Sequence, residues 1–364
     1  WTILHADCLE YLRQMPDESI DAVVTDPPYG LSEHKPAEVA ACLAAWIAGE
    51  PYTPKGRGFM GRAWDAWVPG PEVWREVLRV LKPGGHALIF AGSRTQDLMG
   101  MAVRLAGFEM RDTLQWLYGT GFPKSLDVSK AIDKDRGSWS LRPITQAAAR
   151  PRDPGDVISL DQRSSSERER RDIPATDAAR QWSGWGTALK PAYEPIILAR
   201  KPLRGTVARN VQTYGTGAVN VDACRIGTTK DVPASAARDR IGQVAKGDER
   251  GRTMDTPGFD PNVGRWPANV LLDEAAAAVL DAQSGETVSP ASVTRGGKRG
   301  GQSGMAALGA QDNVPCYGDR GGASRFFYTS KASAKDRGRE EHGNDHPTVK
   351  PTDLMRWLCR LVTP

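Results

Sequence analysis

The feature that most constrains this chain is a short apolar strand that leads directly into a rigid acidic turn. Residues 22–25 (Ala-Val-Val-Thr) precede Asp26-Pro27-Pro28-Tyr29-Gly30. β-branched residues favour a buried strand, and two prolines end it because proline has no backbone N–H to donate. In open α/β sheets, ligands bind beyond the carboxyl ends of the strands. An acid and an aromatic residue at this position therefore indicate a functional loop, with a simple packing turn as the alternative.

The patterns around this loop predict a sheet with helices on it. Strands are expected at residues 2–6, 20–25, 86–91, 113–118 and 193–201. Helices are expected from Pro71 to a stop at 82–85, over 95–106, and after a cap at Thr352. Strands that alternate with helices of this length are typical of a parallel α/β sheet.

The composition excludes several classes of protein. Apolar residues make up 40% and charged residues 25% of the 364, as in ordinary globular proteins. No apolar run approaches the roughly 20 residues of a membrane span, so a cytoplasmic location is expected. The five cysteines form no C-x-x-C pair, and neither a zinc site nor any other metal site is expected. The net charge of +4 is too small to indicate nucleic-acid binding by itself.

Several motifs occur in an order that is similar to one family. Asp26 to Tyr29 resembles the Asp-Pro-Pro-Tyr signature of amino-methylating DNA methyltransferases. Further matches, some typical of phage-type DNA methylases, are residues 5–9, 16–21, 184–195, 265–269, 326–328, 331–333 and 346–351. The catalytic loop precedes the 346–351 segment, which is the permuted, beta-type order. The resemblance implies an α/β, Rossmann-like sheet that depends on S-adenosylmethionine, is circularly permuted and carries an inserted, irregular target-recognition region.

The resemblance also divides the chain into five parts. These are a catalytic core at 1–134, a mobile insertion at 135–180, a core strand at 181–204, a target-recognition region at 205–340, and a return to the core at 341–364. In the family, the glycine-rich cofactor turn follows the last of these segments. The chain starts at Trp1 and ends at Pro364. We therefore expect a fragment whose sheet is incomplete and which, alone, binds the cofactor weakly or not at all and is inactive.

The expected chemistry is methyl transfer to the exocyclic amine of a DNA base that has left the duplex. That amine is a poor nucleophile because its lone pair is delocalised into the ring. The Asp26 carboxylate and the Pro27 carbonyl would accept its two N–H bonds and favour a tetrahedral nitrogen, while Pro28 keeps the loop rigid. Tyr29 would stack on the base. Asp at position 26 favours adenine N6, and cytosine N4 is the alternative because those relatives more often carry Ser there.

Three residues are expected to contact the cofactor by analogy with the family. Asp7 follows a predicted strand and would contact the amine of the cofactor's adenine, or instead cap the following helical turn. Thr348 and Lys350 precede a predicted helix whose start could face the cofactor carboxylate. A plain surface charge is the alternative for Lys350.

Contacts to DNA and further partners follow from the same resemblance. Phe122 is expected to touch the flipped base, Trp116 to pack in the core, and Glu194 to lie near the pocket. Phosphate contacts are expected from Lys124, Arg295, Lys298 and Arg299. Double-stranded DNA is the expected partner, and the resemblance also admits a restriction endonuclease. Two rival interpretations are methylation of a protein glutamine or an RNA base, and a DNA-binding module derived from a methyltransferase that has lost its activity.

Overall fold

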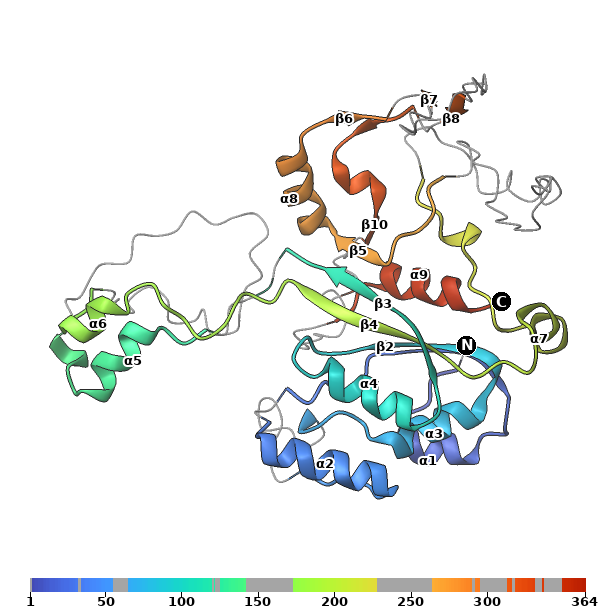
Figure 1. Cartoon of the computed structure of the whole chain (residues 1–364), viewed down its shortest axis with the longest axis horizontal. Coiled ribbons are helices and arrows are strands. Elements are labelled where there is room, and N and C mark those ends of the chain that lie inside the picture. Colours follow the sequence, from blue (N-terminus) through green and yellow to red (C-terminus); the bar gives the residue numbers. More distant parts are fainter. Residues whose placement is uncertain are drawn as a thin grey trace, which may run out of the picture. The chain divides into compact units, whose positions relative to one another are not determined.

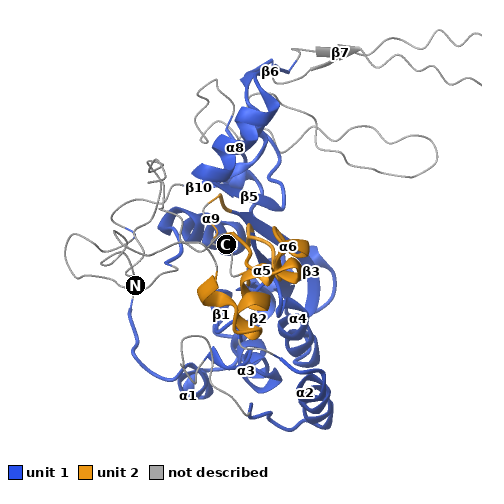
Figure 2. Cartoon of the chain, turned by 90° about the vertical axis from the view of Figure 1, so that its left-hand side faces the viewer, with its two compact units in different colours: residues 1–117, 193–364 blue, residues 118–192 orange. Residues whose placement is uncertain are grey.

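The computed structural model describes two compact units. The described residues are 2–31, 34–54, 65–119, 121, 125–141, 173–227, 264–289, 292–294, 313–315, 318–330, 336 and 349–364. The first unit comprises residues 1–117 and 193–364, and the second comprises residues 118–192 (Figure 2). The second unit is therefore inserted into the chain of the first.

The first unit is built on a six-stranded mixed sheet (Figure 1). Its strands, in spatial order, are β1 (Ile20–Thr25), β2 (Leu81–Phe90), β4 (Tyr193–Arg200), β3 (Glu109–Leu117), β5 (Val270–Asp273) and β10 (Tyr328–Ser330). Strand β4 is antiparallel to both of its neighbours, and all other pairs are parallel. The predicted α/β class is confirmed, but the expectation of a purely parallel sheet is wrong.

The reversal of β4 has a simple topological cause. A parallel neighbour needs a crossover connection, whereas an antiparallel neighbour needs only a turn. Strands β3 and β4 pair directly, from Glu109 opposite Arg200 to Leu117 opposite Tyr193. The pairing continues beyond the strand ends, where the backbone N–H of Tyr118 donates to Ala192 O at 3.0 Å. The two strands thus form a hairpin, and the second unit takes the place of its turn.

Helices cover both faces of this sheet (Figure 1). One face carries α1 (Cys8–Gln14), α2 (Pro36–Ala48), α3 (Pro71–Val80) and α4 (Gln96–Leu105). The other carries α9 (Thr352–Val362), which contacts β1 and β2. The chain also forms α7 (Val207–Tyr214), α8 (Glu274–Ser284) and the short strands β6 (Thr287–Val288), β7 (Ser292–Thr294), β8 (Asn313–Pro315) and β9 (Arg320–Gly321). Helix α9 begins one residue after its cap, Pro351, and not after the predicted cap Thr352.

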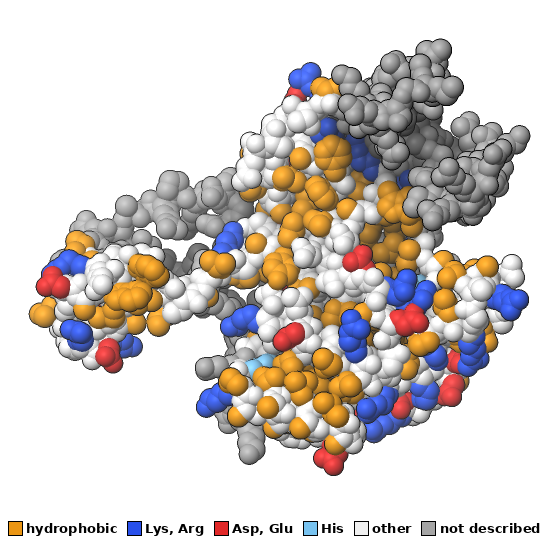
Figure 3. Space-filling model, in the orientation of Figure 1, with side chains coloured by type: hydrophobic (Ala, Val, Ile, Leu, Met, Phe, Trp, Pro, Cys, Tyr) orange, Lys and Arg blue, Asp and Glu red, His pale blue; other side chains and the backbone are white. Residues whose placement is uncertain are grey.

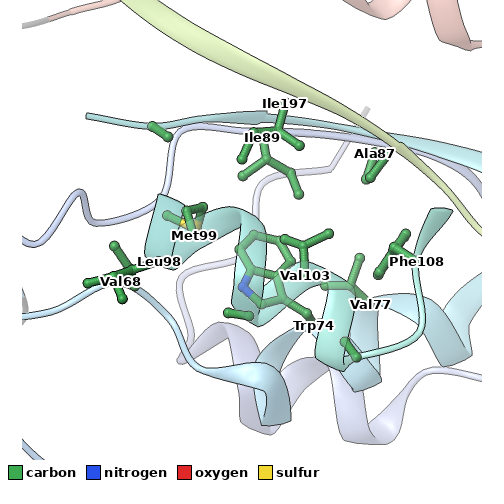
Figure 4. Packing of buried hydrophobic residues seen from close by; sticks show 14 of the residues in the cluster. Val68, Trp74, Val77, Ala87, Ile89, Leu98, Met99, Val103, Phe108 and Ile197 are labelled. Carbon is green, nitrogen blue, oxygen red and sulfur yellow. The ribbon is translucent and has the colours of Figure 1, made fainter. Parts of the chain in front are cut away.

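The main core lies between the sheet and helices α3 and α4 (Figure 4). Trp74 of α3 packs beside Val103 of α4 and below Ile89 of β2, and all three side chains are buried. The indole N–H of Trp74 donates to Pro69 O at 3.1 Å, so this large side chain is buried without an unpaired donor. The amphipathic pattern that predicted α3 therefore identifies the helix face that supports the sheet.

The start of the chain corrects one prediction. Residues 2–6 form no strand, and Ile3 and Leu4 are 78% and 53% exposed. A strand needs a neighbour to accept and donate its backbone hydrogen bonds, and among the described residues β1 is paired only with β2. Helix α2 is the opposite case, since the sequence patterns did not predict it. Its Pro36 in the first turn was the available signal.

The second unit is small and shows apolar side chains at its surface (Figure 3). It contains α5 (Val128–Asp135), a turn of 3-10 helix at Trp139–Leu141 and α6 (Asp177–Gln181). The buried Asp133 carboxylate joins the two helices, accepting hydrogen bonds from Ala175 N at 2.9 Å and Thr176 Oγ1 at 2.7 Å. Most of the predicted mobile insertion, residues 142–172, lies outside the described residues.

Replacement of Trp74 tests the packing of the main core. We expect Trp74→Ala to lower the free energy of unfolding by about 3–5 kcal/mol, because it leaves a cavity under the sheet. Ile47→Ala on α2 is the control, since Ile47 is 76% exposed and its loss should change stability by less than about 0.5 kcal/mol. Urea unfolding followed by far-ultraviolet circular dichroism measures both. Equal losses of unfolding free energy in the two variants would show that this core does not stabilise the fold.

Candidate active site

The Asp26–Tyr29 loop lies at the carboxyl edge of two parallel strands. It follows Thr25, the last residue of β1, which pairs with Ile89 near the end of β2. This is the position that the sequence predicts. The neighbouring strand β4 runs the other way, so its first residues, including Glu194, come to the same edge. One edge of the sheet thus collects side chains from β1 and β4.

The loop is held by hydrogen bonds to its backbone. The N–H groups of Tyr29 and Gly30 both donate to Asp65 Oδ1, at 3.0 and 3.1 Å. Thr95 Oγ1 donates to the Tyr29 carbonyl oxygen at 2.6 Å. Gly30 has a φ of +61°, and a Cβ there would lie 2.8 Å from Val68 N, so the turn requires glycine. Asp65 is buried and was not predicted, because no local motif marks an acid that acts on a distant loop.

Four polar groups meet at the end of the loop and form a closed ring of contacts. The Tyr29 hydroxyl lies 2.8 Å from Asp26 Oδ1 and 2.8 Å from Glu194 Oε2. The ammonium group of Lys350 lies 3.0 Å from Asp26 Oδ2 and 3.1 Å from Glu194 Oε2. Each carboxylate therefore contacts both the phenol and the ammonium. We call Asp26, Tyr29, Glu194 and Lys350 the carboxylate cluster.

The cluster is largely shielded from water, and Asp26 is its most exposed carboxylate. The side chains of Lys350 and Glu194 are 8% and 16% exposed, whereas that of Asp26 is 36% exposed. The alternative that Lys350 is a surface charge is therefore wrong. Burial raises the pKa of the Tyr29 phenol far above its usual range, and the negative charges of Glu194 and Asp26 raise it further. Tyr29 thus stays protonated and remains a hydrogen-bond donor.

Aromatic rings complete the surroundings of Lys350. Its ammonium nitrogen lies 5.4 Å from the ring centroid of Tyr29 and 5.2 Å from that of Phe90, the last residue of β2. A cation near an aromatic face is attracted by the ring quadrupole. The lysine is thus positioned by two carboxylates and two rings, which is more than an incidental ion pair provides.

The other predicted site residues lie elsewhere or outside the described residues. Asp7 caps α1, because its Oδ1 accepts hydrogen bonds from Leu9 N at 2.9 Å and Glu10 N at 3.0 Å, which is the second of the two roles expected for it. Trp116 on β3 is buried, in agreement with the packing role. The predicted contacts that lie outside the described residues are Phe122, Lys124, Arg295, Lys298, Arg299 and Thr348.

The predicted recognition region contains a buried ionic network. Arg265 Nη2 donates to both carboxylate oxygens of Asp319, at 2.7 and 2.6 Å, and Arg325 Nε lies 3.6 Å from Asp319 Oδ1. Both guanidinium groups also lie over the ring of Phe326. Burial opposes ionisation of Asp319, but hydrogen bonds and the two arginines hold the pKa of its carboxyl below the usual range. Arg265 and Arg325 therefore organise this region internally.

The site can now be compared with known proteins. The chain matches the DNA methylase family N6_N4_Mtase over residues 20–364. It belongs to this family. The predicted amino-methylating DNA methyltransferase resemblance is thereby confirmed at the level of the family. The chain is also similar to the type II methyltransferase M.HindIII of Haemophilus influenzae, at 25% identity over 240 residues, which cover 60% of this chain and 64% of that protein. It thus spans less than two thirds of that curated relative.

Solved structures give weaker likenesses to this DNA methylase. TTHA0409 of Thermus thermophilus, described as a DNA modification methylase, is 19% identical with a TM-score of 0.24, over 57% of this chain and 56% of the other. M1.HpyAVI is 13% identical with a TM-score of 0.24, over 55% and 54%. Membership of the family rests on the sequence match over residues 20–364.

Neither a metal cluster nor a membrane span is found in the described part of the chain. No group of three or more histidine, cysteine, aspartate or glutamate side chains there could hold a metal ion. No helix among the described residues is long and apolar enough to cross a membrane.

Removal of Asp65 tests how the loop is held. We expect Asp65→Ala to lower the free energy of unfolding by about 1–3 kcal/mol, because it leaves two buried N–H groups without their acceptor. The amide protons of Tyr29 and Gly30 should exchange with solvent faster in this variant, as hydrogen-exchange mass spectrometry or NMR would show. Asp17→Ala is the control, since Asp17 pairs with Arg79 but is 73% exposed. Unchanged exchange at Tyr29 and Gly30 would contradict this role of Asp65.

Proposed function

We propose that this protein transfers a methyl group from S-adenosylmethionine to the exocyclic amine of a DNA base, adenine N6 in preference to cytosine N4. Family membership supports DNA methylation in general. The observation that carries the finer proposal is the Asp26 carboxylate, which stands at the carboxyl edge of the sheet with 36% of its side chain exposed. It is the acceptor that an amine entering from this edge would meet.

Asp26 has acceptor positions to spare for an incoming amine. A carboxylate offers about four lone-pair positions, and Tyr29 and Lys350 occupy one on each oxygen. The two donors restrain the carboxylate, so an amine N–H can be accepted without first ordering the side chain. Acceptance at Asp26 and at the Pro27 carbonyl would favour a tetrahedral nitrogen with an available lone pair. The proline pair limits movement of that carbonyl, because its φ angles are restricted.

The target base would have to leave the duplex to reach this edge. Unpairing costs a few kcal/mol, and stacking on an aromatic side chain returns about 1–3 kcal/mol. We propose Tyr29 as that stacking surface, since its hydroxyl lies 2.8 Å from the amine acceptor Asp26 and 2.8 Å from Glu194. Double-stranded DNA is the proposed substrate. A restriction endonuclease partner and a cytoplasmic location stay predictions.

The preference for adenine rests on the residue at position 26. An aspartate carries a full charge and accepts an N–H bond strongly. The resemblance associates Asp here with adenine N6 and Ser with cytosine N4. The cytosine amine could approach the same acceptors, so cytosine N4 methylation is the alternative product.

S-adenosylmethionine is the methyl donor that membership of the family implies. Asp7 caps α1 through one of its carboxylate oxygens, and Lys350 contacts two carboxylates. Thr348 lies outside the described residues. Contacts of these three residues with the cofactor stay predictions.

Analysis of the methylated nucleoside tests the proposal. The protein is expressed from its full natural reading frame, purified, and incubated with genomic DNA and S-adenosylmethionine labelled in its methyl group. The digested DNA is then separated into nucleosides. We expect labelled N6-methyl-2′-deoxyadenosine, and a loss of at least about 100-fold in rate for Asp26→Ala, since an acceptor in the transition state is removed. Label found only in N4-methyl-2′-deoxycytidine would overturn the adenine preference. Full activity of Asp26→Ala would overturn the role of Asp26.

A further inference from the structure

Glu194 and Lys350 have no part in the chemistry described so far, yet they are the more buried members of the carboxylate cluster. Burial of a charged group is unfavourable unless it is paired. Two buried charged residues beside a catalytic loop therefore indicate a function for the pair. Their contacts with Asp26 and Tyr29 indicate that this function concerns the loop.

The numbers of protons and charges determine which contacts in the carboxylate cluster can be hydrogen bonds at the same time. A phenol carries a single proton, so Tyr29 can donate to only one of the two carboxylates at a time, although both lie 2.8 Å from its oxygen. An ammonium group has three protons, so Lys350 can donate to both. With both carboxylates ionised and Tyr29 neutral, the cluster carries one net negative charge.

We propose that Glu194 and Lys350 form a neutral positioning pair that keeps the Asp26 carboxylate ionised and free to accept the target amine. Lys350 balances the charge of Glu194, which leaves the single net charge on Asp26. Glu194 also restrains Lys350 and the Tyr29 hydroxyl, so that neither is held by Asp26 alone. This inference rests on the proposed function of Asp26, and it makes Glu194 and Lys350 positioning residues.

The effect of removing either partner follows from the charges. In Lys350→Met, two carboxylates share one phenol without a cation, and like charges at this distance favour uptake of a proton by one of them. Asp26 then loses the ammonium group that restrains it, and it competes with Glu194 for a proton that would make it a weaker acceptor. In Glu194→Gln, the ammonium group is left to Asp26 alone and competes with the target amine. Each single change should therefore reduce kcat, by about 100-fold as for other misplaced catalytic groups.

The double variant separates this charge-balancing role from a merely structural one. Glu194→Gln combined with Lys350→Met restores one net negative charge on Asp26 beside two neutral side chains. We expect it to regain at least about 10-fold in kcat over Lys350→Met, which is a coupling that independent losses cannot produce. If the two residues only stabilise the fold, the reductions in kcat of the two single variants should multiply in the double variant.

The ionisation of the two carboxyl groups provides a second readout that does not depend on activity. Protein labelled with carbon-13 at the aspartate and glutamate carboxyl carbons is examined by NMR at neutral pH. The two signals are identified by their absence in Asp26→Asn and in Glu194→Gln. The Asp26 signal should have the chemical shift of an ionised carboxylate in the natural protein, in Glu194→Gln and in the double variant. In Lys350→Met, the signal of Asp26 or that of Glu194 should move toward that of a protonated carboxyl.

Lys82→Met is a matched control, because Lys82 pairs with Asp21 at 2.6 Å near the starts of β2 and β1, at the edge of the sheet opposite the carboxylate cluster. It should alter neither kcat nor the Asp26 signal. Three outcomes would each overturn the proposal: reductions of kcat that multiply in the double variant, undiminished activity in both single variants, or no movement of either carboxyl signal in Lys350→Met. Inactivity of the natural protein toward DNA would overturn the proposed function instead, and the NMR result would still decide whether the pair balances the charge.

Discussion

A single buried ammonium group holds together three parts of the chain that are far apart in sequence. Lys350 lies just before α9 and contacts Asp26 after β1 and Glu194 on β4. Its ammonium group also makes a cation–π contact with Phe90 at the end of β2. Two acids so near each other would be unfavourable without a cation between them. The candidate site therefore depends on the return of the chain to the sheet at its last helix. A change at this lysine would disturb the Asp26–Tyr29 loop, strand β4 and the start of α9 together.

The reversed strand β4 is the structural condition for that arrangement. Because β4 runs antiparallel between β2 and β3, its first residues lie at the edge where the parallel strands end. The backbone confirms this placement, since Ala91 N donates to Pro195 O at 3.0 Å just past the end of β2. A parallel β4 would have put Glu194 at the opposite edge, away from Asp26. The insertion of the second unit into the β3–β4 hairpin is compatible with the site because the hairpin still closes at Tyr118 and Ala192.

The loop and its partners differ in how well they could be predicted. The position of Asp26 at the end of a buried strand, the helix from Pro71 and the strand near residue 193 follow from local patterns, and the structure contains all three. The prediction of a strand at residues 2–6 was wrong, because a strand is stable only beside a neighbouring strand and none is described there. Asp65 was missed because it acts on the loop through two backbone N–H groups, a contact that leaves no pattern in its own surroundings.

The sequence alone determined the rigid acidic turn at Asp26–Tyr29, since its residues are adjacent and the conformations of proline and glycine are local properties. It also determined the family, because several motifs occur in a consistent order along the chain. Only the tertiary structure decided that Lys350 is buried between two carboxylates and not a surface charge, and that Glu194 shares the Tyr29 hydroxyl with Asp26. The reason is physical: whether a charge is solvated or paired depends on which distant segments the fold brings beside it, and no local preference encodes that.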